Sequence, residues 1–182
     1  MKNEKLQFKI KNFKTLPSTN QKAKEIAKEK LEAWLIIVAE EQTAGYGRKQ
    51  ASWYSPLGGL YFSVVLPKSN IEDLQTLTIL AAFIVAKVIK ANFALEPLIK
   101  LPNDILLNDK KVCGILTENV IGKDVRFSVM GIGLNTNIKE FPKELQETAT
   151  SLKIELGKQV NNLEILKQIV EGLNDQLKGI SE

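Results

Sequence analysis

Two short segments in the first third of the chain carry residue types that can bind an anion or a flat ring. In Gly45-Tyr-Gly-Arg48, two glycines let backbone N–H groups approach an anion, and Arg48 adds positive charge. No Gly-Lys-Ser/Thr follows, so this is not a Walker loop, and Gln50 stands where a dinucleotide fingerprint has its third glycine. Trp53, five residues after Arg48, could stack on a base. Taken alone, the same pattern also fits a flexible loop with a packing anchor.

Two further segments place charged groups beside turns. Lys100-Leu-Pro-Asn-Asp104 is a turn rigidified by proline, which presents Asn103 and Asp104 at a fixed geometry. In Lys111-Val-Cys-Gly114, Lys111 opens a predicted strand and Gly114 interrupts it, which is typical of a bulge or of close ligand approach. A capping turn and a solvated lysine are the alternative interpretations. The spacing predicts an anion-binding site without deciding its chemistry.

The composition excludes several kinds of catalysis. The chain has no histidine, so Ser-His-Asp hydrolysis, Cys-His proteolysis and histidine-ligated metals are excluded. Its one cysteine, Cys113, allows no intrachain disulfide and no cysteine-rich metal cluster, and we assign no protein metal ligands. A general base must then be Asp, Glu, Lys, Tyr or the substrate itself.

The distribution of charge and apolar residues bears on partners and location. Residues 1–30 hold nine lysines and three acids, a net charge of +6. The whole chain has a net charge of +4, so the other 152 residues carry a net charge of −2. That distribution predicts no sequence-specific nucleic-acid binding. The longest apolar run, 79–86, is far shorter than the roughly 20 residues of a membrane helix. We therefore expect a cytoplasmic protein that does not bind membranes.

The elements that must position these residues alternate between strands, hairpins and helices. Period-2 alternation and short apolar runs predict strands over 6–10, 35–39, 60–66, 98–101, 105–107, 112–118 and 125–133. Helical spacing predicts helices after the Ser18-Thr-Asn20 cap and over 71–92, 142–149 and 163–177. The polar segment 40–56 joins two strands as a long loop. Hairpins beside helices favour an α+β domain with a mixed sheet over regular βαβ winding.

The order of these motifs resembles the catalytic core of biotin protein ligases. The resemblance covers about residues 12–175, and only the lipoate ligases are serious competitors. The segments that carry it are Ser18-Thr-Asn20, Gln42-Thr-Ala-Gly-Tyr-Gly-Arg48 with Trp53, Lys100-Leu-Pro-Asn-Asp104, Lys111-Val-Cys-Gly-Ile-Leu116, Gly131-Ile-Gly-Leu-Asn135, and Ala149-Thr-Ser-Leu152 with Gly157.

That resemblance implies a fold related to class II aminoacyl-tRNA synthetases and a ligase that works in two steps. Biotin is activated by ATP with Mg²⁺ as biotinyl-5'-AMP. It is then transferred to a lysine of the biotin carboxyl carrier protein of acetyl-CoA carboxylase. A homodimer is one assembly the resemblance allows. The alternatives are a lipoate-protein ligase type of acyl ligase and a catalytically weak module that binds biotin or nucleotide.

The resemblance also assigns roles to residues. Lys111 would lie between the biotin carboxylate and the α-phosphate, where an ammonium offsets the approach of two anions. The implied catalytic residues are Lys111, Arg48 and Asp104. Biotin binding would fall to Ser18, Thr19, Asn20, Gln42, Tyr46, Gly47, Arg48, Lys111 and Gly114, and ATP binding to Arg48, Trp53, Asn103, Lys111 and Asn135.

The chain departs from the family pattern at several positions. The family loop reads Gly-Arg-Gly-Arg-x-Gly-Arg-x-Trp, whereas Tyr46 here replaces the first arginine, and Gln50 and Ala51 replace the later Gly-Arg pair. Two positive charges are lost, which predicts weaker retention of the adenylate. Leu101 replaces the tryptophan before the Pro-Asn-Asp turn. We expect one catalytic domain over 1–182, with the family's small C-terminal β-barrel absent or truncated and no helix-turn-helix domain.

Overall fold

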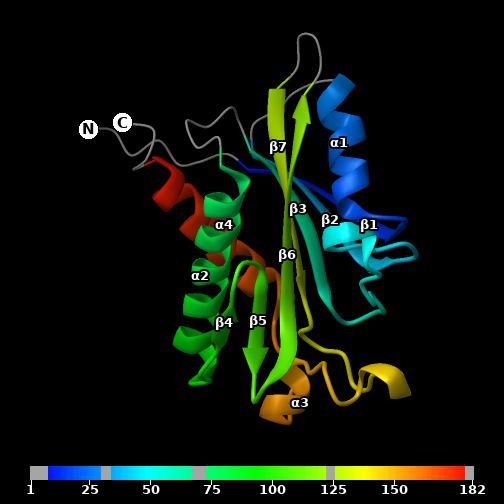
Figure 1. The fold of residues 1–182 in the computed structure, drawn as a ribbon, viewed down its shortest axis with the longest axis vertical. Coiled ribbons are helices and arrows are strands. Elements are labelled where there is room, and N and C mark those ends of the chain that lie inside the picture. Colours follow the sequence, from blue (N-terminus) through cyan, green and yellow to red (C-terminus); the bar gives the residue numbers. More distant parts are fainter. Residues whose placement is uncertain (1–7, 30–33, 67–72, 122–125, 179–182) are drawn as a thin grey trace.

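A mixed seven-stranded sheet forms the centre of the computed structural model, which describes residues 8–29, 34–66, 73–121 and 126–178. The strands lie in the order β1-β2-β3-β7-β6-β5-β4 (Figure 1). They are β1 (Lys9–Leu16), β2 (Leu35–Gln42), β3 (Leu60–Leu66), β4 (Leu98–Lys100), β5 (Asp104–Leu107), β6 (Lys110–Ile121) and β7 (Arg126–Leu134). Strands β1 and β2 are parallel and the other neighbours are antiparallel. The predicted α+β class with a mixed sheet is confirmed.

Helices cover both faces of this sheet. The described α-helices are α1 (Thr19–Glu29), α2 (Leu74–Phe93), α3 (Leu152–Leu156) and α4 (Asn162–Lys178). Helix α1 packs on β2, β3 and β7, while α2 and α4 pack together on the opposite face (Figure 1). Strand β3 is buried throughout because both faces are covered: Phe62 and Val64 join the core under α2 and α4, and Val65 joins the core under α1.

Helix α2 shows how its sequence sets its limits. Asp73 caps its start by accepting hydrogen bonds from the backbone N–H groups of Gln75 and Thr76, and Ala94 ends it with a φ of 54°. Its length and composition would also suit a membrane span, but half of that apolar stretch is buried inside the fold, as in a core helix. The apolar residues of α2 are therefore explained by contact with the sheet and α4.

Most of the predicted elements are present, and one is wrong. Residues 142–149 form only a short 3₁₀ turn, Lys143–Leu145, followed by a turn over 146–148, because Ala149 then forms a β-bridge with Lys111 of β6. The Lys111 N–H donates to the Thr148 carbonyl at 2.8 Å, and the Thr150 N–H donates to the Lys111 carbonyl at 3.0 Å. Helix α3 was not predicted. The first strand runs to Leu16, and residues 122–125, which include the first residue of the predicted strand 125–133, lie outside the described residues.

Candidate active site

A cavity of about 350 Å³ opens on the α1 face of the sheet. Its walls come from the turn between β1 and α1, the glycine loop (residues 43–53), the start of β5, and strands β6 and β7. Twelve of the thirteen residues predicted to form the site line it: Ser18, Thr19, Asn20, Gln42, Tyr46, Gly47, Arg48, Trp53, Asn103, Asp104, Lys111 and Gly114. The thirteenth, Asn135, lines an adjoining cavity of about 190 Å³ that shares Trp53 and Lys111 as walls.

Glycines make the floor of the cavity flat. Gly114 and Gly133 face each other across β6 and β7, and the indole of Trp53 lies on them. A Cβ added to Gly133 would stand 2.5 Å from Trp53 Nε1, and one added to Gly114 would stand 2.9 Å from Trp53 Cζ3. A Cβ on Gly131 would overlap the Asn20 side chain. These positions require glycine because a ring and an amide rest directly on the backbone.

A bulge turns Lys111 toward this floor. Side chains three residues apart on a regular strand point to opposite faces, yet Lys111 and Gly114 both line the cavity. The register between β5 and β6 shifts there, because Leu106 pairs with Lys111 whereas Ile105 pairs with Cys113. The extra residue turns the Lys111 side chain to the same face as Gly114. The sequence offered a bulge or close approach as reasons for a glycine at position 114. The bulge lies just before Gly114, and the Trp53 ring lies against Gly114 itself.

The ionised groups form a row along one wall. Lys111 Nζ lies 2.7 Å from Asp104 Oδ1 and 4.9 Å from the centre of the Trp53 ring. The Asn103 amide donates to Asp104 at 3.1 Å, and Arg48 Nη1 donates to Asn103 Oδ1 at 3.4 Å. Lys111 and Asp104 are 31% and 25% exposed, so both reach the solvent-filled space where a ligand would lie.

The Cys113 thiol lies near this row of charged groups but does not take part in it. Burial raises the pKa of the Cys113 thiol despite the nearby Lys111 charge, so the thiol stays protonated and unreactive. No group of three or more His, Cys, Asp or Glu side chains lies together within the described ranges.

Buried polar side chains at another part of the wall hold one another in place. The N–H and hydroxyl of Thr19 both donate to Gln42 Oε1, at 2.8 and 3.2 Å, and Gln42 Nε2 donates to Ser55 Oγ at 2.9 Å. The Ser63 hydroxyl donates to Asn20 Oδ1 at 2.6 Å and lies 2.8 Å from the Thr19 hydroxyl. These bonds fix the orientation of both amides.

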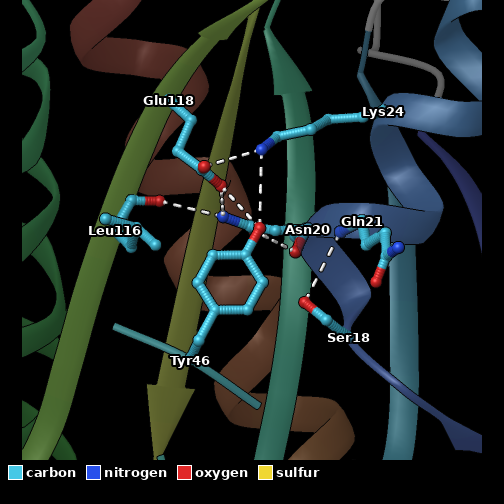
Figure 2. Close-up of polar contacts among 8 residues, drawn as sticks. Ser18, Asn20, Gln21, Lys24, Tyr46, Leu116 and Glu118 are labelled. Atoms are coloured by element: carbon cyan, nitrogen blue, oxygen red, sulfur yellow. Dashed lines mark hydrogen bonds and ion pairs between the residues drawn. The ribbon is translucent and has the colours of Figure 1, made fainter. Parts of the chain in front are cut away.

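Asn20 also belongs to a second cluster, shown in Figure 2. Its amide nitrogen donates to Glu118 Oε2 at 2.8 Å, and the Tyr46 hydroxyl donates to the same oxygen at 3.1 Å. Glu118 Oε1 lies 2.6 Å from Lys24 Nζ. Burial lowers the pKa of Lys24, but hydrogen bonding and the charge of Glu118 outweigh it and raise this pKa. Burial and the charge of Glu118 raise the pKa of Tyr46. At neutral pH the lysine is charged and the phenol is neutral.

Four of these residues were missed in the sequence: Lys24, Ser55, Ser63 and Glu118. Ser63 carried a signal, because it is the only hydroxyl besides the phenol of Tyr61 in the apolar strand 60–66. Glu118 lies four residues after Gly114, on the same face of a strand, and Lys24 lies one helical turn after Asn20. Periodicity could have placed both beside the cavity.

The fold and the cavity define a class of protein: α+β catalytic domains with the architecture of the class II aminoacyl-tRNA synthetases. The model of the biotin/lipoate A/B protein ligase family matches residues 12–135, and the chain belongs to that family.

Relatives and solved structures agree with this assignment. The chain is 38% identical over 160 residues to the bifunctional ligase/repressor BirA of Bacillus spizizenii, covering 85% of this chain and 49% of that protein. It is 37% identical over 107 residues to the biotin–[acetyl-CoA-carboxylase] ligase of Paracoccus denitrificans, covering 57% of this chain and 44% of that protein. The biotin protein ligase from Aquifex aeolicus in complex with biotin and ATP matches with a TM-score of 0.84 and 31% identity, over 95% of this chain and 72% of that one. The chain spans about half the length of the curated relatives it matches.

Proposed function

We propose that this chain activates biotin with ATP as biotinyl-5'-AMP and transfers it to a lysine of the biotin carboxyl carrier protein of acetyl-CoA carboxylase. The observation that carries the proposal is one cavity that joins the Lys111–Asp104 pair, Arg48 and Trp53 to a wall of buried amides and hydroxyls. The structure from Aquifex aeolicus, which holds biotin and ATP, supports this choice of substrates.

Each part of the cavity suits one part of these substrates. The ureido ring of biotin has both donors and a carbonyl acceptor, which Ser18, Thr19 and Asn20 can satisfy with buried polar atoms. Leu116 supplies apolar wall for the acyl tail. On this proposal the head group lies at Asn20 and the carboxylate points toward Lys111.

The adenine would lie against Trp53 and Asn135. Asn135 Oδ1 and Trp53 Nε1 are buried and have no hydrogen-bond partner in the structure, which is costly unless a ligand or water supplies one. Asn135 is 3% exposed and lines the adjoining cavity together with Trp53. Its side-chain oxygen can accept from an exocyclic amine, and the indole offers a face for stacking.

In the first step a biotin carboxylate oxygen attacks the α-phosphorus, and pyrophosphate leaves with the electrons of the broken P–O bond. Two anions must meet, so the Lys111 ammonium stabilises both the approach and the transition state. In the second step the carrier amine attacks the acyl carbon and AMP leaves. Asp104, 2.7 Å from Lys111, orients that ammonium and can accept the proton that the attacking amine loses. Arg48 would hold the adenylate phosphate until the carrier arrives.

Magnesium fits this cavity as a companion of the nucleotide. Asp104 is the carboxylate among the cavity-lining residues, with the Asn103 amide beside it, and Mg²⁺ ordinarily takes one or two carboxylates with phosphate oxygens and water. Asp104 would therefore hold the ion, which supplies neutralisation of phosphate charge. We further infer that the enzyme acts in the cytoplasm and binds neither membranes nor specific nucleic-acid sequences. A homodimer is one assembly to test.

The test compares pyrophosphate release with ATP alone, with ATP and biotin, and with ATP and lipoate, followed by transfer to purified biotin carboxyl carrier protein. Biotin-dependent release and labelled carrier protein would support the proposal. Lipoate-dependent release would indicate a lipoate ligase instead. Biotin binding without any pyrophosphate release would indicate a binding module.

A further inference from the structure

The side-chain amide of Asn20 lies on the cavity wall, and its two ends offer different chemistry to a ligand. Asn20 is the second residue of α1, and its side chain rests on Gly131 of the floor. The helix fixes the backbone, but a half-turn of the amide about its last bond would exchange the oxygen and the nitrogen. A ligand N–H can bind the oxygen, whereas a ligand carbonyl can bind the nitrogen. The contacts that orient the amide therefore decide which ligands fit.

One of these contacts distinguishes the two ends of the amide more strongly than the others. The Asn20 nitrogen donates to Glu118 Oε2 at 2.8 Å and to the Leu116 carbonyl at 3.4 Å (Figure 2). Its oxygen accepts from the Ser63 hydroxyl at 2.6 Å. A hydroxyl can donate or accept, so Ser63 would bind either end, and the contact with Leu116 is long for a hydrogen bond. The carboxylate of Glu118 only accepts, and it is the strong contact that excludes the reversed amide.

Lys24, one turn further along the same helix, holds that carboxylate in place. Its Nζ lies 2.6 Å from Glu118 Oε1, and the Tyr46 hydroxyl donates to Oε2 at 3.1 Å. Lys24 and Glu118 are each 23% exposed and do not line the cavity, so their effect on a ligand is indirect. Lys22 and Glu25, an ion pair on the same helix, are 35% and 54% exposed. Water screens that second pair more strongly, which makes it a suitable control.

The remaining bonding capacity of Asn20 follows from these contacts. Both protons of its amide nitrogen are used, and its oxygen has one lone pair left after the bond from Ser63. We propose that Glu118 and Lys24 are positioning residues that make Asn20 an acceptor only, so that the wall selects a ligand with a ring N–H and rejects one with an acceptor in its place. That this group is a ureido N–H of biotin rests on the proposed function.

The test compares biotin with two cyclic carbamate analogues, in each of which oxygen replaces one ring N–H. The parent chain should bind one of them about a hundred-fold or more weakly than biotin, because two acceptors would face each other. Glu118→Gln should reduce this preference about ten-fold, since the new amide can donate to a reversed Asn20. Lys24→Met should act in the same direction, and Lys24→Arg should retain the preference of the parent. Titration calorimetry measures each dissociation constant.

Two control substitutions separate this role from a merely structural one. Ser63→Ala should weaken the binding of biotin and of the analogue alike and keep the preference, because Glu118 still orients the amide. Lys22→Met, in the exposed ion pair, should change neither affinity. Melting temperatures check that each variant is folded. An unchanged preference in both Glu118→Gln and Lys24→Met would overturn the proposal.

A measurement on the free chain keeps this proposal distinguishable from the proposed function. In the nuclear magnetic resonance spectrum, the Asn20 amide is identified by its loss in Asn20→Asp. One of its protons should lie downfield because of the carboxylate, and it should move to the ordinary range in Glu118→Gln. That movement in a chain that binds no biotin would leave the orientation standing and reject the proposed function. A resonance that stays in place would overturn the orientation, whatever the chain binds.

Discussion

The contact between Gly133 and Trp53 allows a sharp test of how the proposed nucleotide site is built. Gly133→Ala adds one methyl group at a point where the indole rests on β7. The new Cβ would lie 2.5, 2.8 and 3.1 Å from Trp53 Nε1, Cε2 and Cζ2. Carbon atoms pack best at roughly 3.5–4.0 Å, so the ring must move by about 1 Å. The ring will yield rather than the strand, because Gly133 is paired with both Tyr61 and Gly114.

The size of the effect follows from that overlap. Overpacking of this kind costs about 1–3 kcal/mol, which for a chain of this length lowers the melting temperature by about 2–12 °C. Displacing the indole also changes its contact with Lys111 and, on the proposed function, the face on which the adenine would stack. We expect the affinity for ATP to fall about ten-fold, which is about 1.4 kcal/mol.

A double-mutant cycle isolates this contact. Gly133→Ala should cost stability and ATP affinity in the parent chain but add little to Trp53→Ala, because the overlapping ring is then absent. Gly47→Ala is the control for melting, since a Cβ there meets only the Ala51 carbonyl oxygen at 3.8 Å. Calorimetric titration with ATP and thermal unfolding of the four chains measure both quantities. If Gly133→Ala costs as much without the indole as with it, the assigned packing is wrong.

Three other substitutions or conditions have defined outcomes. Lys111→Ala should lower biotin-dependent pyrophosphate release by about 10²–10³-fold, about 3–4 kcal/mol, with a nearly unchanged melting curve. Arg48→Gly should still adenylate but release biotinyl-5'-AMP roughly one to two decades faster, seen as labelling of an unrelated lysine-rich protein. Burial raises the pKa of Tyr61, and the pKa of Tyr46 is also raised, so the folded chain holds both protons more tightly than the unfolded one. That stability is complete below about pH 10 and is lost as pH rises further; melting temperatures from pH 7 to 11 should fall at the alkaline end, less so in Tyr61→Phe.

The hydrophobic pattern of the sequence predicted those helices and strands whose structure depends mainly on their own residues. The apolar run 60–66 became β3 with the same bounds, and the long stripe in 71–92 became α2. The apolar stripe of α2 is long enough for its period to decide its structure, and the shortness of the run 60–66, with its aromatic and β-branched residues, favours a strand. The helix predicted over 142–149 failed because the pattern is short and a distant strand competes for its backbone. The backbone at 148–150 bonds Lys111, with Ala149 in a β-bridge, and no local signal reports that partner.

The sequence predicted most of the residues that line the cavity, but not how their side chains are arranged. Twelve predicted residues converge because the motifs lie at strand ends and turns, where sequence chemistry is visible. The bulge that turns Lys111 to the same face as Gly114 depends on the register with β5, which a single strand cannot reveal. Glu118 and Lys24 gain their importance only from being 2.6 Å apart, although they are 94 positions apart in the chain. Interactions of this kind are set by the topology of the sheet.

Strand β6 arranges the cavity in a linear order, which orients the substrate on the proposed function. Leu116 pairs with Gly131, over which Asn20 lies, and Gly114 pairs with Gly133 two residues along the strand. Two residues of extended chain span about 7 Å. The Lys111 side chain reaches the Gly114 end, where its Cε would lie 3.3 Å from an added Cβ. The polar wall and the ammonium are thus separated by the length of a short acyl tail. A small head group held at Asn20 would present its carboxylate to Lys111, and a nucleotide would occupy the Trp53 end.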